Sequence, residues 1–438
     1  MSTNDVSVFE SLESEVRLYC RTFPAVFSRA KGAELYAEDG RGFIDFFCGA
    51  GTLNFGHNND IIKSRLLSYL AADGLTHGLD LYSVAKRDFL TRFRDVVLDP
   101  RGLDHKIQFC GPTGTDAVEA ALKLARKATG RPGIVAFSGA YHGMSRGSLS
   151  VTGSRRARAA GGVGATDVTF VPFEDGPAGQ FDSIGYLERM LADPASGMDI
   201  PAAVIVEPLQ MEGGVYPAST RWLRDLRELT ARHGILLICD EIQSGCGRTG
   251  TFFSFEPAGV VPDIVTLSKS ISGYGLPLSI VLLRRALDVW SPGEHTGTFR
   301  GNQLAFVTAT AALELWSGAE VQDGLTAAIS RLRRFAAELR ATEPGLTVRG
   351  RGMVLGIDLG SALRAELVQR CCFDTGLIVE LCGREDEVIK VMPPLTIDAA
   401  TLDRGLTLLL DALRDGQAAA GAGAIAARPA AVRVAGTR

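Results

Sequence analysis

Short apolar runs alternate with helical stretches through the middle of the chain. Between about residues 108 and 283, continuously hydrophobic runs lie at 134–137, 168–171, 202–206, 235–239, 264–267 and 280–283. Strands that are apolar on both faces are typical of a parallel sheet covered by helices on both sides. Helical segments at 115–128, 181–191 and 219–233 lie between these runs. The pattern predicts an α/β domain built on a mostly parallel sheet.

The flanking segments have different patterns. Residues 33–46 predict two short strands around an Asp39-Gly40 turn. Two helical segments follow between 303 and 341, and 345–414 predicts a smaller α+β unit with a closing helix. We therefore expect 1–75 to be an N-terminal segment of the small domain, 76–320 the large domain and 321–415 the C-terminal small domain. Because 416–438 is rich in Ala and Gly and poor in bulky residues, we expect a disordered tail.

Composition excludes several classes of function. The chain has 438 residues, of which 46% are hydrophobic and 22% charged, as in soluble globular proteins. A net charge of −4 without a basic stripe argues against nucleic acid as the principal partner. No apolar run is long enough to span a membrane, and the first residues are polar and acidic. We expect a soluble, cytoplasmic protein.

The cysteines and histidines suggest no metal site. The eight cysteines form no C-x-x-C pair, and the six histidines are scattered along the chain. In a cytosolic protein such cysteines are expected to be reduced and mostly buried. We therefore predict no bound metal.

Three of the predicted strands end in ionisable residues, namely Glu207, Asp240 and Lys269. In open α/β sheets, ligands bind outside the carboxyl ends of the strands. A charge at the end of a buried strand is costly unless it is paired, so any one of these residues could belong to a structural salt bridge. Three together on one sheet favour a shared functional site.

Lys269 is the strongest candidate for chemistry. The chain has only eight lysines, and Lys269 alone ends an apolar strand and enters a Ser/Gly-rich turn. Burial lowers the pKa of a lysine and leaves a nucleophilic amine suited to Schiff-base formation. Pyridoxal 5'-phosphate (PLP) requires such a lysine for its aldehyde and a carboxylate for its ring nitrogen, which Asp240 could supply.

Other segments offer groups for the rest of that cofactor. The turn containing Gly114 and Thr115 leads directly into a helix, whose N-terminus favours a phosphate, although ordinary helix capping gives the same pattern. Tyr141 follows a predicted strand and could stack on a ring or lie at the edge of the core. Gln243 lies just beyond the strand of Asp240, and the Gly/Thr-rich loop around Thr298 could supply a further hydroxyl.

The segment Asp240-Glu-Ile-Gln-Ser-Gly-Cys-Gly-Arg-Thr-Gly250, followed by Lys269 at 29 residues from Asp240, resembles the signature of class III (omega-type) PLP-dependent aminotransferases. The resemblance covers about residues 10–415. It includes Asn54-Phe-Gly-His57, Tyr141-His-Gly143, Glu207-Pro208, Gly213-Gly214, Thr298-Phe-Arg-Gly-Asn302 and Pro393-Pro-Leu395. It implies the fold type I of PLP-dependent transferases, with 76–320 as the PLP-binding domain.

The resemblance also implies roles for individual residues. Lys269 would bind the cofactor as a Schiff base and then act as the acid and base, and Asp240 would pair with the pyridinium. The remaining cofactor-binding residues would be Gly114 and Thr115 at the phosphate, Tyr141 and His142 near the ring, Gln243 at the ring hydroxyl, and Thr298 at the phosphate of the neighbouring subunit. The substrate-binding residues would be Tyr19, Glu207 and Lys390. Many members of the family have an arginine for a substrate carboxylate where this chain has Lys390.

Several stretches, such as Gly74-Leu-Thr-His-Gly-Leu-Asp80 and Gly111-Pro-Thr-Gly-Thr115, resemble the branch of the family that makes diaminobutyrate for ectoine and related pathways. This similarity implies amino transfer from L-glutamate to L-aspartate 4-semialdehyde in a homodimer or higher homo-oligomer. The alternatives are an aminotransferase for another terminal amine such as ornithine or 4-aminobutyrate, a PLP-dependent racemase or aminomutase, and a non-catalytic protein of the same fold.

Overall fold

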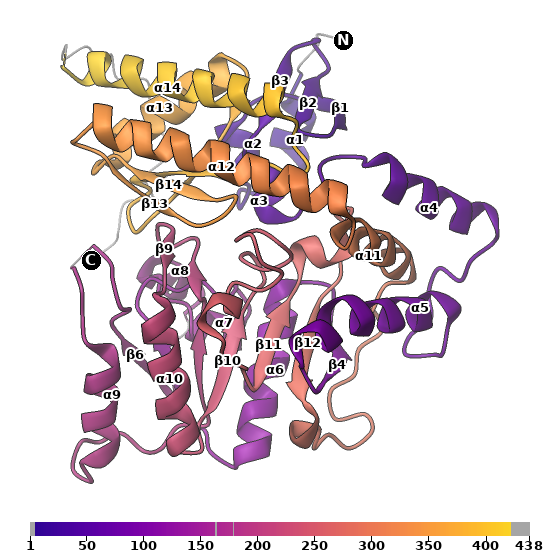
Figure 1. Ribbon diagram of the computed structural model, residues 1–438, viewed down its shortest axis with the longest axis vertical. Helices are drawn as coiled ribbons and strands as arrows, with labels where there is room; N and C mark the ends of the chain where they lie inside the picture. The colour runs from indigo at the N-terminus through magenta and orange to yellow at the C-terminus, as the bar shows by residue number, and fades with distance from the viewer. Residues whose placement is uncertain (1–4, 163, 178, 422–438) are drawn as a thin grey trace.

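The computed structural model describes residues 5–162, 164–177 and 179–421. A large central sheet with its helices occupies the lower part of Figure 1, and smaller sheets with further helices lie above it. The N-terminal elements are α1 (Ser7–Leu12), α2 (Tyr19–Thr22), β1 (Phe27–Lys31), β2 (Glu34–Ala37), β3 (Gly42–Asp45), α3 (Cys48–Gly51), α4 (Asp60–Ala71) and α5 (Val84–Phe93).

The large sheet has seven strands in the order β4-β12-β11-β10-β7-β5-β6. These strands are β4 (His105–Phe109), β5 (Ile134–Phe137), β6 (Val168–Val171), β7 (Ala203–Val206), β10 (Leu236–Asp240), β11 (Ile264–Leu267) and β12 (Ile280–Arg284). The helices between and after them are α6 (Gly114–Thr129), α7 (Arg146–Ser150), α8 (Arg155–Ala160), α9 (Ser183–Ala192), α10 (Thr220–Arg232) and α11 (Gln303–Trp316). A short hairpin, β8 (Leu209–Gln210) and β9 (Tyr216–Pro217), follows β7.

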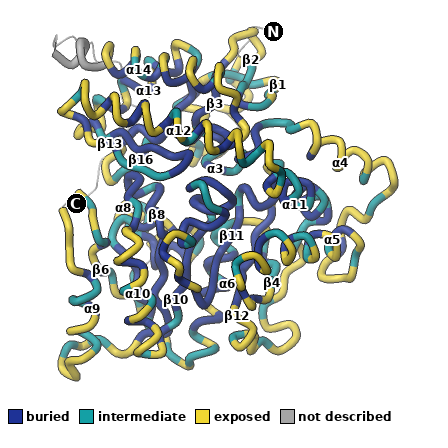
Figure 2. Tube along the Cα trace, viewed as in Figure 1, coloured by how far each residue is buried: buried dark blue, intermediate teal, exposed yellow. Residues whose placement is uncertain are grey.

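Alternate residues of the central strands pack into two different cores, which explains why these strands are apolar throughout. On β7, Val204 and Val206 belong to one core, whereas Ala203 and Ile205 belong to the other. Buried residues of α10 join the first core and those of α6 join the second, so helices cover both faces of the sheet. Figure 2 shows the middle strands buried, with exposed positions concentrated on outer elements such as α4 and α9.

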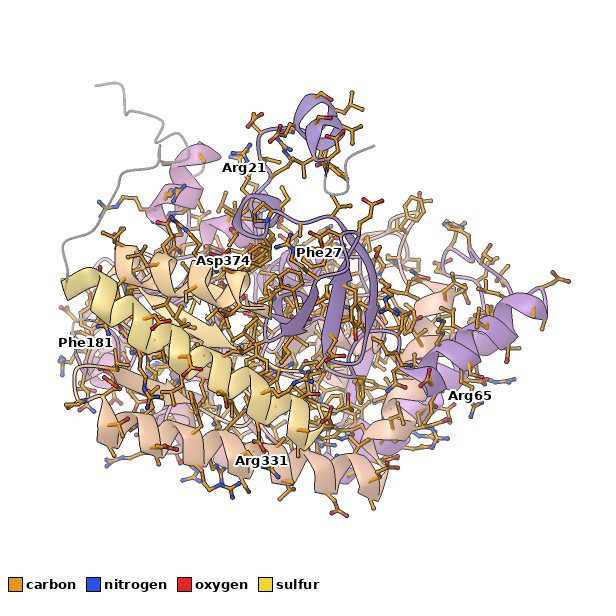
Figure 3. All side chains as sticks on the ribbon, turned by 90° about the horizontal axis from the view of Figure 1, so that it is seen from above. Arg21, Phe27, Arg65, Phe181, Arg331 and Asp374 are labelled. Atoms are coloured by element: carbon orange, nitrogen blue, oxygen red, sulfur yellow. The ribbon has the colours of Figure 1, made fainter. Side chains whose placement is uncertain are left out.

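The C-terminal part contains α12 (Ala319–Thr342), β13 (Thr347–Gly350), β14 (Leu355–Asp358), α13 (Ala362–Asp374), β15 (Leu377–Ile378), β16 (Glu380–Cys382), β17 (Val388–Val391) and α14 (Ala399–Gly421). Strand β15 pairs in parallel with β3, so the N-terminal and C-terminal segments share a sheet. Figure 3 shows α12, α13 and α14 side by side, and an ion pair of 2.7 Å joins Arg331 on α12 to Asp403 on α14.

The expected α/β architecture and all six apolar strands are confirmed. The sheet is mostly parallel, as expected. Strand β12 runs antiparallel to both of its neighbours, β11 and the edge strand β4. The expected disorder from residue 416 is wrong for 416–421, which continue α14. Alanine-rich sequence has high helix propensity and extends a helix that packing has already started. Residues 422–438 lie outside the described part of the chain.

The described residues lack two features, namely a helix able to span a membrane and a cluster of metal-binding side chains. Across the described ranges, no helix combines the length and apolar character needed to cross a membrane. The same residues contain no cluster of three or more His, Cys, Asp or Glu side chains arranged to hold a metal ion.

Candidate active site

The three strand-end residues meet at one cavity. Strands β7, β10 and β11 are neighbours and parallel, so their carboxyl ends lie at the same edge of the sheet and carry Glu207, Asp240 and Lys269 there. These residues line a cavity of about 310 Å³. The other lining residues are Thr113, Gly114, Thr115, Tyr141, His142, Gly143, Met144, Ile242, Gln243 and Ser244.

Asp240 is a buried carboxylate held in one orientation. Its Oδ1 accepts hydrogen bonds from Thr266 Oγ1 at 2.9 Å and from the Ile242 amide at 3.1 Å. Its Oδ2 lies 2.7 Å from His142 Nδ1. Both side chains are nearly inaccessible, and His142 Nε2 has no hydrogen-bond partner among the described residues. The pair therefore presents a fixed carboxylate and an unsatisfied ring nitrogen beside the cavity.

Lys269 occupies an unusual backbone conformation. Its φ of +51° lies in the left-handed region, which a non-glycine residue rarely adopts and which costs on the order of 1 kcal/mol. Burial lowers the pKa of Lys269, while the carboxylate of Glu212 opposes this effect. A lysine with a lowered pKa spends more time as the neutral amine, which is the nucleophilic form.

The N-terminus of α6 forms a cradle at one end of the cavity. The helix begins at Gly114, and Thr113 and Asp116 bond to one another in a capping box. Thr115 Oγ1 hydrogen bonds with Ser145 Oγ at 2.6 Å and with Ser148 Oγ. Free amides, hydroxyls and the helix dipole together make this end suited to an anion such as phosphate.

Tyr141 and Glu207 are linked through the backbone. The Tyr141 amide donates to Glu207 Oε1 at 2.8 Å, and the Met211 amide donates to Oε2 at 3.3 Å. Burial raises the pKa of Glu207 to about 7. Glu207 therefore fixes the turn that carries Tyr141, a positioning role that sequence reasoning did not assign to it. Gln243 lies at the cavity wall with its amide donating to the Ala50 carbonyl at 2.9 Å.

The other predicted substrate residues lie in a separate group, the distal cluster, which consists of Tyr19, Glu212, Glu380 and Lys390. Lys390 is fully buried, donates a hydrogen bond to Glu212 Oε1 and lies 3.0 Å from Glu380 Oε2. Tyr19 Oη donates to Glu380 Oε1 at 3.1 Å. Glu212 and Glu380 raise the pKa of Lys390 despite its burial. The ammonium is thus held between two carboxylates.

Sequence reasoning missed both glutamates of this cluster. Glu380 lies opposite Lys390 in the antiparallel pair of β16 and β17, so only the strand register reveals their proximity. Glu212 lies in the turn between β8 and β9, directly before the Gly213-Gly214 pair noted in the sequence. Thr298, in contrast, is exposed on the loop after β12 and is not among the residues that line its own chain's cavity.

The signature segment also has a structural role. Arg248 is fully buried and donates to the carbonyls of Met353 (3.0 Å) and Pro393 (2.5 Å), as well as to the Asn54 side chain (2.5 Å). It therefore ties the loop after β10 to an N-terminal turn and to the C-terminal part. The segments 54–57, 240–250 and 393–395 therefore meet in the fold although they are distant in the sequence.

Comparison with known proteins identifies the family. The class III aminotransferase family matches residues 19–413. The chain is 52% identical to a diaminobutyrate–2-oxoglutarate transaminase of Nocardia farcinica, covering 94% of this chain and 95% of that protein. It is 53% identical to an uncharacterized aminotransferase of Sinorhizobium fredii, covering 93% and 92%.

Solved structures agree with this match. The ornithine aminotransferase of Toxoplasma gondii superposes with a TM-score of 0.83 at 26% identity, covering 95% of this chain and 96% of that one. A second structure of that enzyme, with PLP at partial occupancy in its active site, gives a TM-score of 0.81 at 26% identity and 94% coverage of each chain. The expected fold type I of PLP-dependent transferases is confirmed. This chain belongs to the class III aminotransferases.

Proposed function

We propose that this protein is a PLP-dependent aminotransferase that moves an amino group from L-glutamate to L-aspartate 4-semialdehyde, giving L-2,4-diaminobutyrate and 2-oxoglutarate. The observation that carries the proposal is the 52% identity, over 94% of this chain, to a relative named for the diaminobutyrate–2-oxoglutarate reaction. Lys269 and Asp240 meeting in one cavity support the same chemistry. Cytoplasmic location and use of the product in ectoine biosynthesis stay predictions.

The residues around the cavity fit PLP. A buried lysine, a fixed carboxylate and a helix N-terminus with hydroxyls are the three groups that an aldehyde, a ring nitrogen and a phosphate require. Gly143 shows how closely the wall approaches Thr115, because a Cβ there would lie 2.5 Å from Thr115 Oγ1. When bound, PLP supplies an aldehyde for the lysine and a protonated ring that accepts electron density.

The protein's own side chains would hold the cofactor and move the proton. Lys269 Nζ would be the covalent attachment point and, as the free amine, would move the proton at the substrate carbon. Asp240, fixed by Thr266 and the Ile242 amide, keeps a negative charge where the ring nitrogen binds. Gly114 and Thr115 would hold the phosphate, Tyr141 and His142 would border the ring, and Gln243 would contact the ring hydroxyl, since all five residues line the cavity.

The proposed reaction is tested by an amino-acceptor screen with glutamate as the donor. Aspartate 4-semialdehyde should be the best acceptor among terminal aldehydes, ahead of the semialdehydes that correspond to ornithine and 4-aminobutyrate. In the reverse direction, diaminobutyrate should be consumed only when 2-oxoglutarate is present, since a transaminase needs a keto acid acceptor. Consumption without any keto acid would indicate a racemase or an aminomutase instead.

A prediction concerns Lys390 as the group that binds a substrate carboxylate. Lys390→Ala should raise the KM for glutamate and for 2-oxoglutarate about 10- to 100-fold, because a charge-assisted hydrogen bond contributes roughly 1.5–3 kcal/mol. Lys390→Arg, which keeps the charge, is the matched control and should retain most of the affinity. If the KM of every carboxylate substrate stays unchanged in a folded Lys390→Ala protein, Lys390 only balances Glu212 and Glu380.

The proposal includes a homodimer in which Thr298 reaches the phosphate bound by the partner. Thr298 is exposed and does not line its own chain's cavity, although its loop leads to α11. The rings of His77 and Phe299 lie 5.4 Å apart and bring segment 75–82 beside this loop. Leu79, Leu81, Tyr82 and Phe299 are all exposed, and apolar side chains gathered on a surface favour a protein interface.

A mixed dimer tests this arrangement. Lys269→Ala and Thr298→Glu chains should each be inactive, the second because its carboxylate repels the phosphate. In a heterodimer with shared sites, one site combines Lys269 of the Thr298→Glu chain with Thr298 of the Lys269→Ala chain. Both groups are intact at that site, so co-expression should restore activity. If verified heterodimers stay inactive while each parent chain still dimerises, the shared site is wrong.

A further inference from the structure

The charges of the distal cluster do not balance. Two carboxylates, Glu212 and Glu380, share the single ammonium of Lys390. Lys390 donates a hydrogen bond to Glu212, and its ammonium also lies 3.0 Å from Glu380 Oε2. With these contacts and the hydrogen bond from Tyr19, Glu380 keeps spare acceptor capacity, since a carboxylate accepts up to about four hydrogen bonds. The other cation whose charge acts on both carboxylates is Lys269, which would lose its free ammonium when PLP is attached, and the cluster would then lack one cation.

Such an imbalance is costly where Glu380 lies. The residue is only 5% exposed, and a buried carboxylate is destabilising unless it is paired. Burial raises the pKa of Glu380, against the opposing effect of the Lys390 ammonium. A buried acid with spare acceptor capacity is a suitable site for a cationic group that enters from outside.

The distal cluster lies close enough to Lys269 for its charges to act on that amine. The turn that carries Glu212 is fixed to the cavity wall, because the Met211 amide bonds to Glu207, and to β16, because the Gly383 amide donates to the Glu212 carbonyl at 2.9 Å. The charges of Glu212, Lys390 and Glu380 all act on Lys269. Tyr19, which donates its hydrogen bond to Glu380, is 45% exposed, so one member of the cluster lies at the surface.

We propose that Glu380 is the specificity-determining residue that binds the ammonium group which a diamino substrate keeps while its other amine reacts. The inference rests on the proposed function and extends it, since aspartate 4-semialdehyde and 2,4-diaminobutyrate both carry an α-ammonium that takes no part in the transfer. Tyr19 orients the Glu380 carboxylate, and Lys390 stays paired with Glu212 while the diamino substrate is bound. Substrates without that ammonium leave Glu380 without its cation.

Two amine donors isolate this contact. L-2,4-Diaminobutyrate and 4-aminobutyrate have the same chain, the same reacting amine and the same carboxylate, and differ only by the α-ammonium. With 2-oxoglutarate as acceptor, the wild-type kcat/KM should favour diaminobutyrate about 10- to 100-fold, as expected for a charged hydrogen bond. In Glu380→Gln this preference should disappear, because kcat/KM falls for diaminobutyrate and stays within about threefold for 4-aminobutyrate.

Two control variants make the result decisive. Glu385→Gln, an exposed residue between β16 and β17, should keep the wild-type preference, and Glu380→Asp, which keeps the charge, should keep part of it. Equal losses for both donors in Glu380→Gln, or an unchanged preference, would overturn the role of Glu380. A wild-type protein that uses both donors equally well overturns it without any variant.

Failure of the proposed function is recognised separately. If the wild-type protein does not turn over diaminobutyrate but does use ornithine, the reaction assignment is wrong. The same comparison is then made with ornithine and 5-aminopentanoate, which again differ only by the α-ammonium. Loss of that preference in Glu380→Gln supports the ammonium site, and its persistence rejects the site.

Discussion

Replacing Lys269 with alanine is expected to abolish transamination. The variant loses both the amine that attaches the cofactor and the group that moves the proton, so kcat should fall by roughly 10⁴-fold or more. Borohydride reduction of the wild-type protein should attach a pyridoxyl phosphate group to the peptide that contains Lys269. Peptide mapping by mass spectrometry measures the label, and steady-state kinetics measure the loss.

The controls use other lysines of the chain. Lys123, which donates to the Glu294 carbonyl at the surface, should carry no label, and Lys123→Ala should keep full activity. The Lys269→Ala protein should still bind PLP through the phosphate cradle, but without the visible absorbance of a lysine Schiff base. A label on Lys123 or Lys390 would contradict the assignment of the site.

The second large effect is expected for Asp240→Asn. A carboxylate about 4 Å from a pyridinium, at an effective dielectric of about 20, contributes about 4 kcal/mol, or roughly three pKa units. Without it the ring nitrogen loses its proton, and kcat should fall about 10³-fold even though the side-chain shape is kept. Steady-state kinetics at saturating PLP measure this loss apart from any loss of cofactor.

Asp263→Asn is the matched control. Asp263 is also a buried aspartate (3% exposed), but it precedes β11 at the opposite end of the strand, where it pairs with Arg227 and Arg284. Its replacement should lower the thermal stability and leave the kcat of the folded enzyme close to that of the wild type. Similar kcat losses in the two variants would mean that buried charge, rather than the ring contact, explains the effect of Asp240.

The central strands were predictable because burial on both faces leaves a continuous apolar run. Strand β4 (HKIQF) lies at the sheet edge and carries polar residues, so it gave no such run. The antiparallel direction of β12 has no counterpart in its composition, since parallel and antiparallel buried strands are equally apolar. The direction of a strand in the sheet depends on the connection that precedes it. The local pattern of apolar residues did not predict the path of this connection.

The residues of the candidate site likewise fall into those that the sequence pattern predicted and those that it did not. Glu207, Asp240 and Lys269 were found because each terminates an apolar strand, and neighbouring parallel strands end at one edge. The distal cluster was only half found, because Lys390 and Glu380 meet through the register of β16 and β17. The contact between His142 and Asp240 depends on how the loop after β5 folds back, which the spacing of residues does not fix.

The most direct test of the proposed reaction follows the nitrogen itself. Purified protein with PLP, isotopically labelled L-glutamate and aspartate 4-semialdehyde should give L-2,4-diaminobutyrate that carries the label on the 4-amino nitrogen, together with an equal amount of 2-oxoglutarate. Mass spectrometry and nitrogen NMR locate the label. Failure to aminate the semialdehyde, while the semialdehyde of ornithine or of 4-aminobutyrate becomes labelled, would contradict the proposed function.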